Sequence, residues 1–213
     1  ELMDEDILGV VGPFGVVNGD GTVTRLCVEN STIKYLKEGM RAGGIAARLT
    51  DNGVISNCLV KGCKVENNGR SGVVGGIVAD MFDQSAIRNC LVVKTTLSAT
   101  RTGYICGDTK NGTEISRCYT DGNNLISEAG AILSHCFPGV DEASLGTGEV
   151  AYGLNNESDI NAEPAWYQNL STGSVQDSIP VLLSDHAMVF KTTKGGKCYL
   201  AHNKSNIPKA TLK

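Results

Sequence analysis

Acidic side chains recur at a regular interval along this chain of 213 residues. Asp20, Asp51 and Asp83, followed by Asn111, are spaced 31, 32 and 28 residues apart. If these positions stack, their carboxylates line one edge of the molecule. Stacked like charges raise each other's pKa or attract a cation such as calcium. The edge is therefore a candidate site for a cation, for a glycan or for acid–base chemistry.

A second acidic column precedes the first by three residues. Asp80 and Asp108 occupy equivalent places in successive repeats, and Arg48 occupies the same place one repeat earlier. A basic side chain beside stacked carboxylates is similar to the arrangement in parallel β-helix lyases, which hold calcium and abstract a proton. The candidate ligand- or cation-binding residues are therefore Asp20, Asp51, Asp83, Asn111, Asp80 and Asp108.

A structural role explains the first column equally well. Its members lie in the turn sequences DG, DNG, DQS and NGT, where Asp and Asn cap the backbone with their side chains. In that interpretation each side chain bonds to amides of its own loop, and both interpretations stay open.

Cysteine forms a third column, at Cys27, Cys58, Cys90 and Cys118, with Cys136 extending it. We expect a reduced, buried ladder, because free cysteine packs as a small hydrophobic residue. Side chains that point in parallel do not favour the disulfide torsion near 90°. A linear column also cannot supply tetrahedral ligands, so we expect no structural metal.

These columns follow from a repeat. The segments GPFGVV, GGIAAR, GGIVAD and GYICGD begin at Gly12, Gly43, Gly75 and Gly103, and each starting glycine precedes a cysteine by 15 residues. A constant half and a variable half at this period are typical of a solenoid. The apolar residues alternate as they do in short strands. We predict an all-β fold, with about four coils of stacked parallel strands over residues 12–137 and a corner at Asn57.

The units GGIAAR…VISNCLV and GGIVAD…AIRNCLV resemble GLUG-type repeats, which occur in bacterial adhesins and in stalk regions of secreted peptidases. The resemblance covers roughly residues 12–137 and implies a right-handed parallel β-helix. Residues 148–191 resemble, more loosely, the segment that follows such repeats in surface proteins of Bacteroides-like bacteria.

The flanking segments differ from the repeats. We expect residues 1–11 to form a lead-in or cap, and 138–213 to form a C-terminal capping region that covers the open solenoid end. In the latter, Thr147 is a plausible N-cap of a short helix that includes Glu149. The segments IPVLL, AMVF and KCYL are typical of strands.

Composition and motifs limit the classes of function that this chain can have. The net charge of −4, without a run of Lys or Arg, argues against nucleic-acid binding, and no apolar run is long enough to span a membrane. No common catalytic motif is present. The leading hypothesis is a non-enzymatic bacterial cell-surface module, adhesin-like or a spacer, that binds a host surface or a glycan. The alternative is a carbohydrate-active β-helix protein, a lyase, hydrolase or glycan-binding domain, that uses the acidic edge. We expect an extracellular location, an export signal outside this sequence, and no cofactor other than calcium.

Overall fold

The computed structural model describes residues 9–35, 40–110, 112–128, 130–155, 164–170, 176–191 and 198–201. The chain divides into two units, Glu1–Gly139 and Val140–Lys213. The first contains all the parallel strands and the second contains both described helices.

The first unit is a solenoid of short strands. Its first three turns each contain five strands, and the fourth contains four, followed by one last strand. The first two turns comprise β1 (Val10–Val11), β2 (Phe14–Val17), β3 (Thr22–Thr24), β4 (Cys27–Glu29), β5 (Thr32–Tyr35), β6 (Arg41–Gly43), β7 (Ala46–Leu49), β8 (Val54–Ser56), β9 (Leu59–Lys61) and β10 (Lys64–Asn67). The remaining strands are β11 (Val73–Gly75), β12 (Val78–Met81), β13 (Ala86–Arg88), β14 (Leu91–Val93), β15 (Thr96–Ser98), β16 (Arg101–Gly103), β17 (Cys106–Thr109), β18 (Glu114–Ser116), β19 (Tyr119–Thr120) and β20 (Ile132–Ser134).

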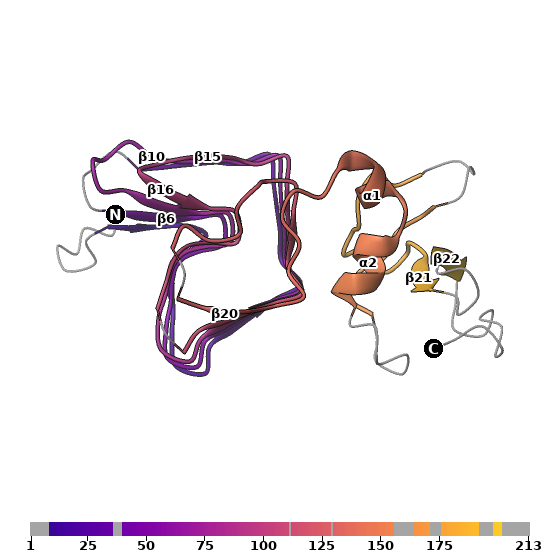
Figure 1. Ribbon diagram of the computed structural model, residues 1–213, viewed down its shortest axis with the longest axis horizontal. Coiled ribbons are helices and arrows are strands. Elements are labelled where there is room, and N and C mark those ends of the chain that lie inside the picture. Colours follow the sequence, from indigo (N-terminus) through magenta and orange to yellow (C-terminus); the bar gives the residue numbers. More distant parts are fainter. Residues whose placement is uncertain are drawn as a thin grey trace. The chain divides into compact units, whose positions relative to one another are not determined.

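Equivalent strands of successive turns pair in parallel and form five sheets, so the turns superimpose in Figure 1. The strand orders are β1-β6-β11-β16, β17-β12-β7-β2, β20-β18-β13-β8-β3, β19-β14-β9-β4 and β15-β10-β5. The predicted all-β parallel solenoid is confirmed. The number of coils is corrected from about four to about three, because only three turns are complete.

The core is a set of stacked apolar columns. Ile55, Ile87 and Ile115 are paired in register and are fully buried. The predicted corner residue Asn57 has φ of 51° and Asn89 has φ of 52°. This left-handed conformation, which Asn tolerates, ends the alternation of the strand and lets the residues on both sides of the corner face the core.

The first turn departs from the predicted alignment. Val11 pairs with Ala42, an offset of 31 residues, but Phe14 pairs with Ala46, an offset of 32. The first turn is therefore one residue shorter at this corner. As a result Cys27 lies opposite Leu59 and not opposite a cysteine. The ladder position in this turn belongs to Leu26, so the placement of Cys27 in the cysteine ladder is wrong.

The second unit contains α1 (Glu142–Gly146), α2 (Glu149–Leu154) and the antiparallel pair β21 (Met188–Lys191) and β22 (Cys198–Ala201). The side chain of Asp141 accepts a hydrogen bond from Ser144 N–H and begins α1. Thr147 ends α1, and Gly148, with φ of 88°, precedes α2. The predicted short helix with Glu149 in its first turn is confirmed as α2, but its N-cap is Gly148 and not Thr147.

Two of the three strand segments predicted in the second unit are confirmed as β21 and β22. The third, IPVLL, contributes a single bridge between Val181 and Tyr167.

Candidate functional site

The second acidic column lies on the sheet that contains β7, β12 and β17. Asp80 pairs in register with Arg48 on one side and with Asp108 on the other, as the repeat predicts. Only 1% of Asp80 and 6% of Asp108 are exposed, so these carboxylates belong to the interior of the solenoid wall and not to its surface.

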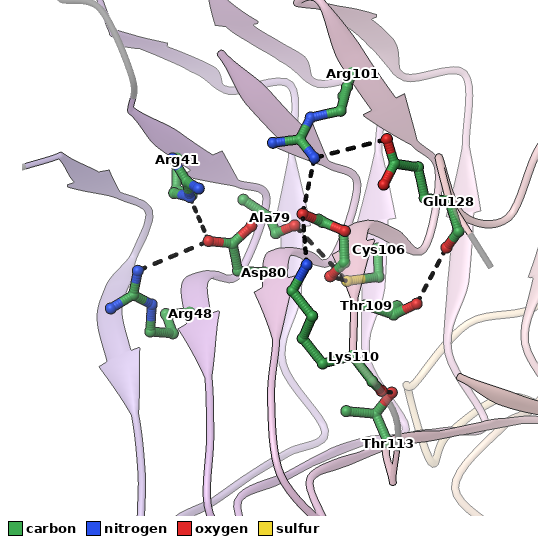
Figure 2. A network of polar contacts seen from close by, with 11 residues as sticks. Arg41, Arg48, Ala79, Asp80, Arg101, Cys106, Thr109, Lys110, Thr113 and Glu128 are labelled. Carbon is green, nitrogen blue, oxygen red and sulfur yellow. Dashed lines mark hydrogen bonds and ion pairs between the residues drawn. The ribbon is translucent and has the colours of Figure 1, made fainter. Parts of the chain in front are cut away.

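Two arginines neutralise Asp80. The Oδ2 atom accepts a hydrogen bond from Nε of Arg41, and Nη2 of Arg48 lies 3.7 Å from the same oxygen (Figure 2). The two guanidinium groups come from different sheets, Arg41 from β6 and Arg48 from β7. The Asp80 carboxylate is thus held by Arg48 of the neighbouring strand in its own sheet and by Arg41 of the sheet across the corner.

Asp108 has a matching environment one turn further along. Its Oδ2 atom lies 2.9 Å from Nη1 of Arg101 and 3.6 Å from Nζ of Lys110. Arg101 also lies 3.8 Å from the Glu128 carboxylate, which links the pair to the segment after β19 (Figure 2). The two stacked carboxylates are therefore surrounded by four cationic side chains.

Glycine brings these groups together. Arg41 and Asp80 lie on two different sheets. In each turn a tight corner joins these sheets, and it starts at Gly43, Gly75 or Gly103 in successive turns. A Cβ at Gly75 would lie 1.6 Å from the carbonyl oxygen of Val78, and one at Gly43 would lie 1.8 Å from that of Ala46. Only glycine permits so close an approach, so the GGI motif sets the distance at which the arginines reach the carboxylates.

Burial controls the electrostatics of this network. Removal from water raises the pKa of Asp80, and Arg41 opposes that rise. Within the described part of the chain, the Oδ1 atoms of Asp80 and Asp108 are buried and accept no hydrogen bond. Each carboxylate uses its other oxygen for the cations, so both carboxylates are enclosed beneath cationic side chains that are themselves partly exposed.

The repeat did not predict the cationic partners Arg41, Arg101 and Lys110. Arg41 and Arg101 share a column, since both pair with Val73 between them. Each stands two residues before its corner glycine, and that spacing is the signal that could have identified them.

The first acidic column lies in exposed loops. Asp51 and Asp83 have φ of 57° and 58°, the left-handed conformation of a tight turn. Gly19 N–H donates to Asp51 Oδ2 at 3.2 Å, and Asp51 N–H donates to Asp83 Oδ2 at 3.4 Å. Thr50 Oγ1 also donates to Asp83, at 2.7 Å. Each carboxylate therefore caps an amide of the preceding turn, which corrects the expected bond within its own loop.

Asp20 is not in this column. Because the first turn is one residue shorter, Gly19 takes the position of Asp51, and Asp20 accepts a 3.3 Å hydrogen bond from Nδ2 of Asn52. The fourth expected member, Asn111, lies outside the described residues. The loops form a shallow depression lined by Asp51, Asn52, Asp83, Gln84 and Gly112.

The cysteine ladder consists of Cys58, Cys90, Cys118 and Cys136. The first three are fully buried, and Cys136 is partly exposed. Cys27, beside the ladder, is exposed. All these thiols are free, as are those of Cys63 and Cys106. Burial raises the pKa of Cys90 and Cys118, so both remain protonated.

Among the described residues, no cluster of three or more His, Cys, Asp or Glu side chains is arranged to hold a metal ion. The helices in that part of the chain are all too short or too polar to cross a membrane.

The chain matches no family model, no curated protein and no solved structure in the three comparisons made. The class of protein is therefore defined by its own architecture: a parallel β-solenoid with a buried ionic cluster, a loop edge of capping aspartates and a ladder of thiols.

Proposed function

We propose that this chain is a non-enzymatic module of a bacterial cell surface, in which a GLUG-type β-solenoid serves as a spacer or presents its faces to a host surface or a glycan. The main support is the state of the acidic groups. The carboxylate with a raised pKa, Asp80, is 1% exposed and paired with arginines, and its neighbour Asp108 is paired in the same way.

A lyase or hydrolase needs an acid or base within hydrogen-bond reach of its substrate. Asp80 and Asp108 are buried in the wall and are paired with Arg41 and Arg101 of the adjoining sheet. Their role in the proposed module is to join two sheets across the glycine corner, which keeps successive turns in register.

The test combines binding with turnover. The purified chain is applied to a glycan array with and without calcium, and incubated with a panel of acidic and neutral polysaccharides. We expect no new reducing ends and no unsaturated products. Turnover by the wild-type protein that disappears in the folded Asp80→Asn variant would overturn the proposal and favour the carbohydrate-active alternative.

One observation favours a second candidate function, glycan or calcium binding at the loop edge. The depression beside Asp51 and Asp83 is open and polar, and Asn52 and Gln84 add amide groups of the kind that bind sugar hydroxyls. In that case array binding is expected to be lost in the Asn52→Ala, Gln84→Ala double variant and retained in Asp80→Asn.

A further inference from the structure

The cysteine ladder ends in a rung unlike the others. Ser116 pairs with Ser134, and Tyr119 bridges to Phe137, so Cys118 and Cys136 occupy the same place on successive turns. Cys118 is fully buried, whereas Cys136 is partly exposed. The last rung is therefore the point at which a solvent-borne reagent can meet the ladder.

The two thiols at this end are stacked neighbours. Hydrogen bonding between their side chains is a cause of the pKa shift of each thiol. The Cys136 sulfur also lies 3.3 Å from the carbonyl oxygen of Ile115 and 3.4 Å from that of Ser134. The same paired contacts recur at Cys118, with the carbonyl oxygens of Ile87 and Ser116. The ladder is thus continuous up to its exposed end.

The strands that hold the two cysteines differ in freedom. Cys118 lies two residues after the end of β18, which pairs with β13 on one side and β20 on the other. Cys136 follows β20, an edge strand with β18 as its one partner in the sheet. Stacked strands lie about 4.8 Å apart, within the Cα separations of disulfides. The edge strand can shift to reach the required torsion, whereas the inner rungs are held on both sides.

We propose that Cys136 is a peroxide-reactive thiol and that Cys118 is its resolving partner. The Cys136 thiolate attacks a hydroperoxide, which breaks the O–O bond and gives a sulfenic acid and an alcohol, or water when the reagent is hydrogen peroxide. The Cys118 thiol then attacks that sulfur, and a disulfide forms with release of water. The two thiols lose two electrons in total, and the peroxide gains them.

The ionisation of the pair supports this division of roles. The hydrogen bond from Cys118 lowers the pKa of Cys136 to about 7, against the opposing effect of burial. Burial raises the pKa of Cys118, which therefore keeps the proton that it donates. A thiolate is the nucleophile in such reactions, so Cys136 attacks first and the buried thiol acts second.

The experiment uses the wild-type chain. The protein is treated with limiting hydrogen peroxide at pH 7, the remaining thiols are alkylated, and peptides are mapped by mass spectrometry. We expect a Cys118–Cys136 disulfide as the first product. Cys27 is the internal control, because it is an exposed thiol outside the ladder. Cys136 should react at least roughly tenfold faster than Cys27, because partial burial and the nearby Glu29 carboxylate raise the pKa of Cys27 to about 12 and keep that thiol protonated at pH 7.

A single variant separates the two steps. In Cys118→Ser the hydroxyl still offers a hydrogen bond to Cys136, but the sulfenic acid has no resolving partner, so a dimedone probe should label Cys136. In the wild-type chain the disulfide should outcompete the probe. In the matched variant Cys27→Ala the disulfide should form as in the wild type. Preferential oxidation of Cys27, or oxidation of Cys136 in the wild type without a link to Cys118, would overturn the proposal.

Discussion

Two acidic columns lie three residues apart in the repeat, and they have different roles. Asp80 is buried and meets Arg41 and Arg48, whereas Asp83 lies in an exposed loop and caps a backbone amide of the preceding turn. The residue type and the stacking are the same in both. The comparison shows that a repeated carboxylate is not by itself a site, because its neighbours decide whether it is a fixed structural charge or a turn cap.

The difference arises from the position of each column relative to the glycine corner. Asp80 lies in β12, directly after the corner, where the sheet that contains Arg41 approaches. Asp83 lies beyond the end of that strand, where the Thr50 hydroxyl and the Asp51 amide of the preceding turn are the donors. Charge pairing dominates at the first position and backbone geometry dominates at the second.

The largest expected effect is at the buried column. Asp80→Ala removes the acceptor shared by Arg41 and Arg48. We expect the free energy of unfolding to fall by about 3 kcal/mol, the lower end of the range for a broken buried ion pair, because both arginines can turn partly toward water. Urea denaturation measures the change in free energy of unfolding. The matched variant Asp83→Ala should cost about 1 kcal/mol, mainly because alanine is strained at φ of 58°. Equal losses at the two positions would mean that the ionic cluster contributes no more than a turn cap.

The second effect is the pH dependence of the same cluster. Burial raises the pKa of Asp80 above its usual value of 3.8, so the folded protein takes up a proton there before the unfolded chain does. Stability from this group is present below the unfolded pKa and is lost as the pH rises through the folded pKa.

We therefore expect the wild type to gain stability relative to Asp80→Asn as the pH falls from 7 toward 4. Urea denaturation of both proteins across this range measures the difference. If the wild type instead lost stability relative to Asp80→Asn as the pH falls, Arg41 and Arg48 would outweigh desolvation and hold the pKa of Asp80 below its usual value.

The sequence predicted the inner turns well because their repeats are complete. Ile55, Ile87 and Ile115 lie at the same distance from the glycine that starts each repeat, and they form one column. Asn57 marks the corner that lets its neighbours face the core. The first turn was misaligned, since a residue missing between Gly12 and Phe14 shifts everything after it. Cys27 then falls at the expected distance by coincidence.

The repeat placed Arg48 beside Asp80, but it did not identify the partners across the corner, Arg41 and Arg101. A repeat predicts which residues stack within one sheet, but it does not predict which sheets face each other across a corner. Arg41 and Asp80 are 39 residues apart and share no repeat position. Their contact follows from the tight glycine corner, a three-dimensional property that the period alone does not contain.

The smallest expected effect is at the loop edge. Asp51→Asn and Asp83→Asn should each change the free energy of unfolding by less than about 0.5 kcal/mol, because asparagine supplies the same acceptor and tolerates the left-handed turn. Thermal melting of the two variants and the wild type, with and without calcium, measures both the effect of the substitutions and the effect of calcium on stability.

Calcium binds six to eight oxygens, and Oδ2 of Asp51 and of Asp83 already accepts backbone amide hydrogens in the loop edge. A cation would have to compete with these hydrogen bonds, so we expect no calcium-dependent shift in the melting temperature. An occupied site would stabilise the protein by about 2.7 kcal/mol at a hundredfold excess of calcium over the dissociation constant. A shift of that size, present in the wild type and in Asp80→Asn but lost in the Asp51→Asn, Asp83→Asn double variant, would make the exposed column a cation site and reverse the comparison of the two columns.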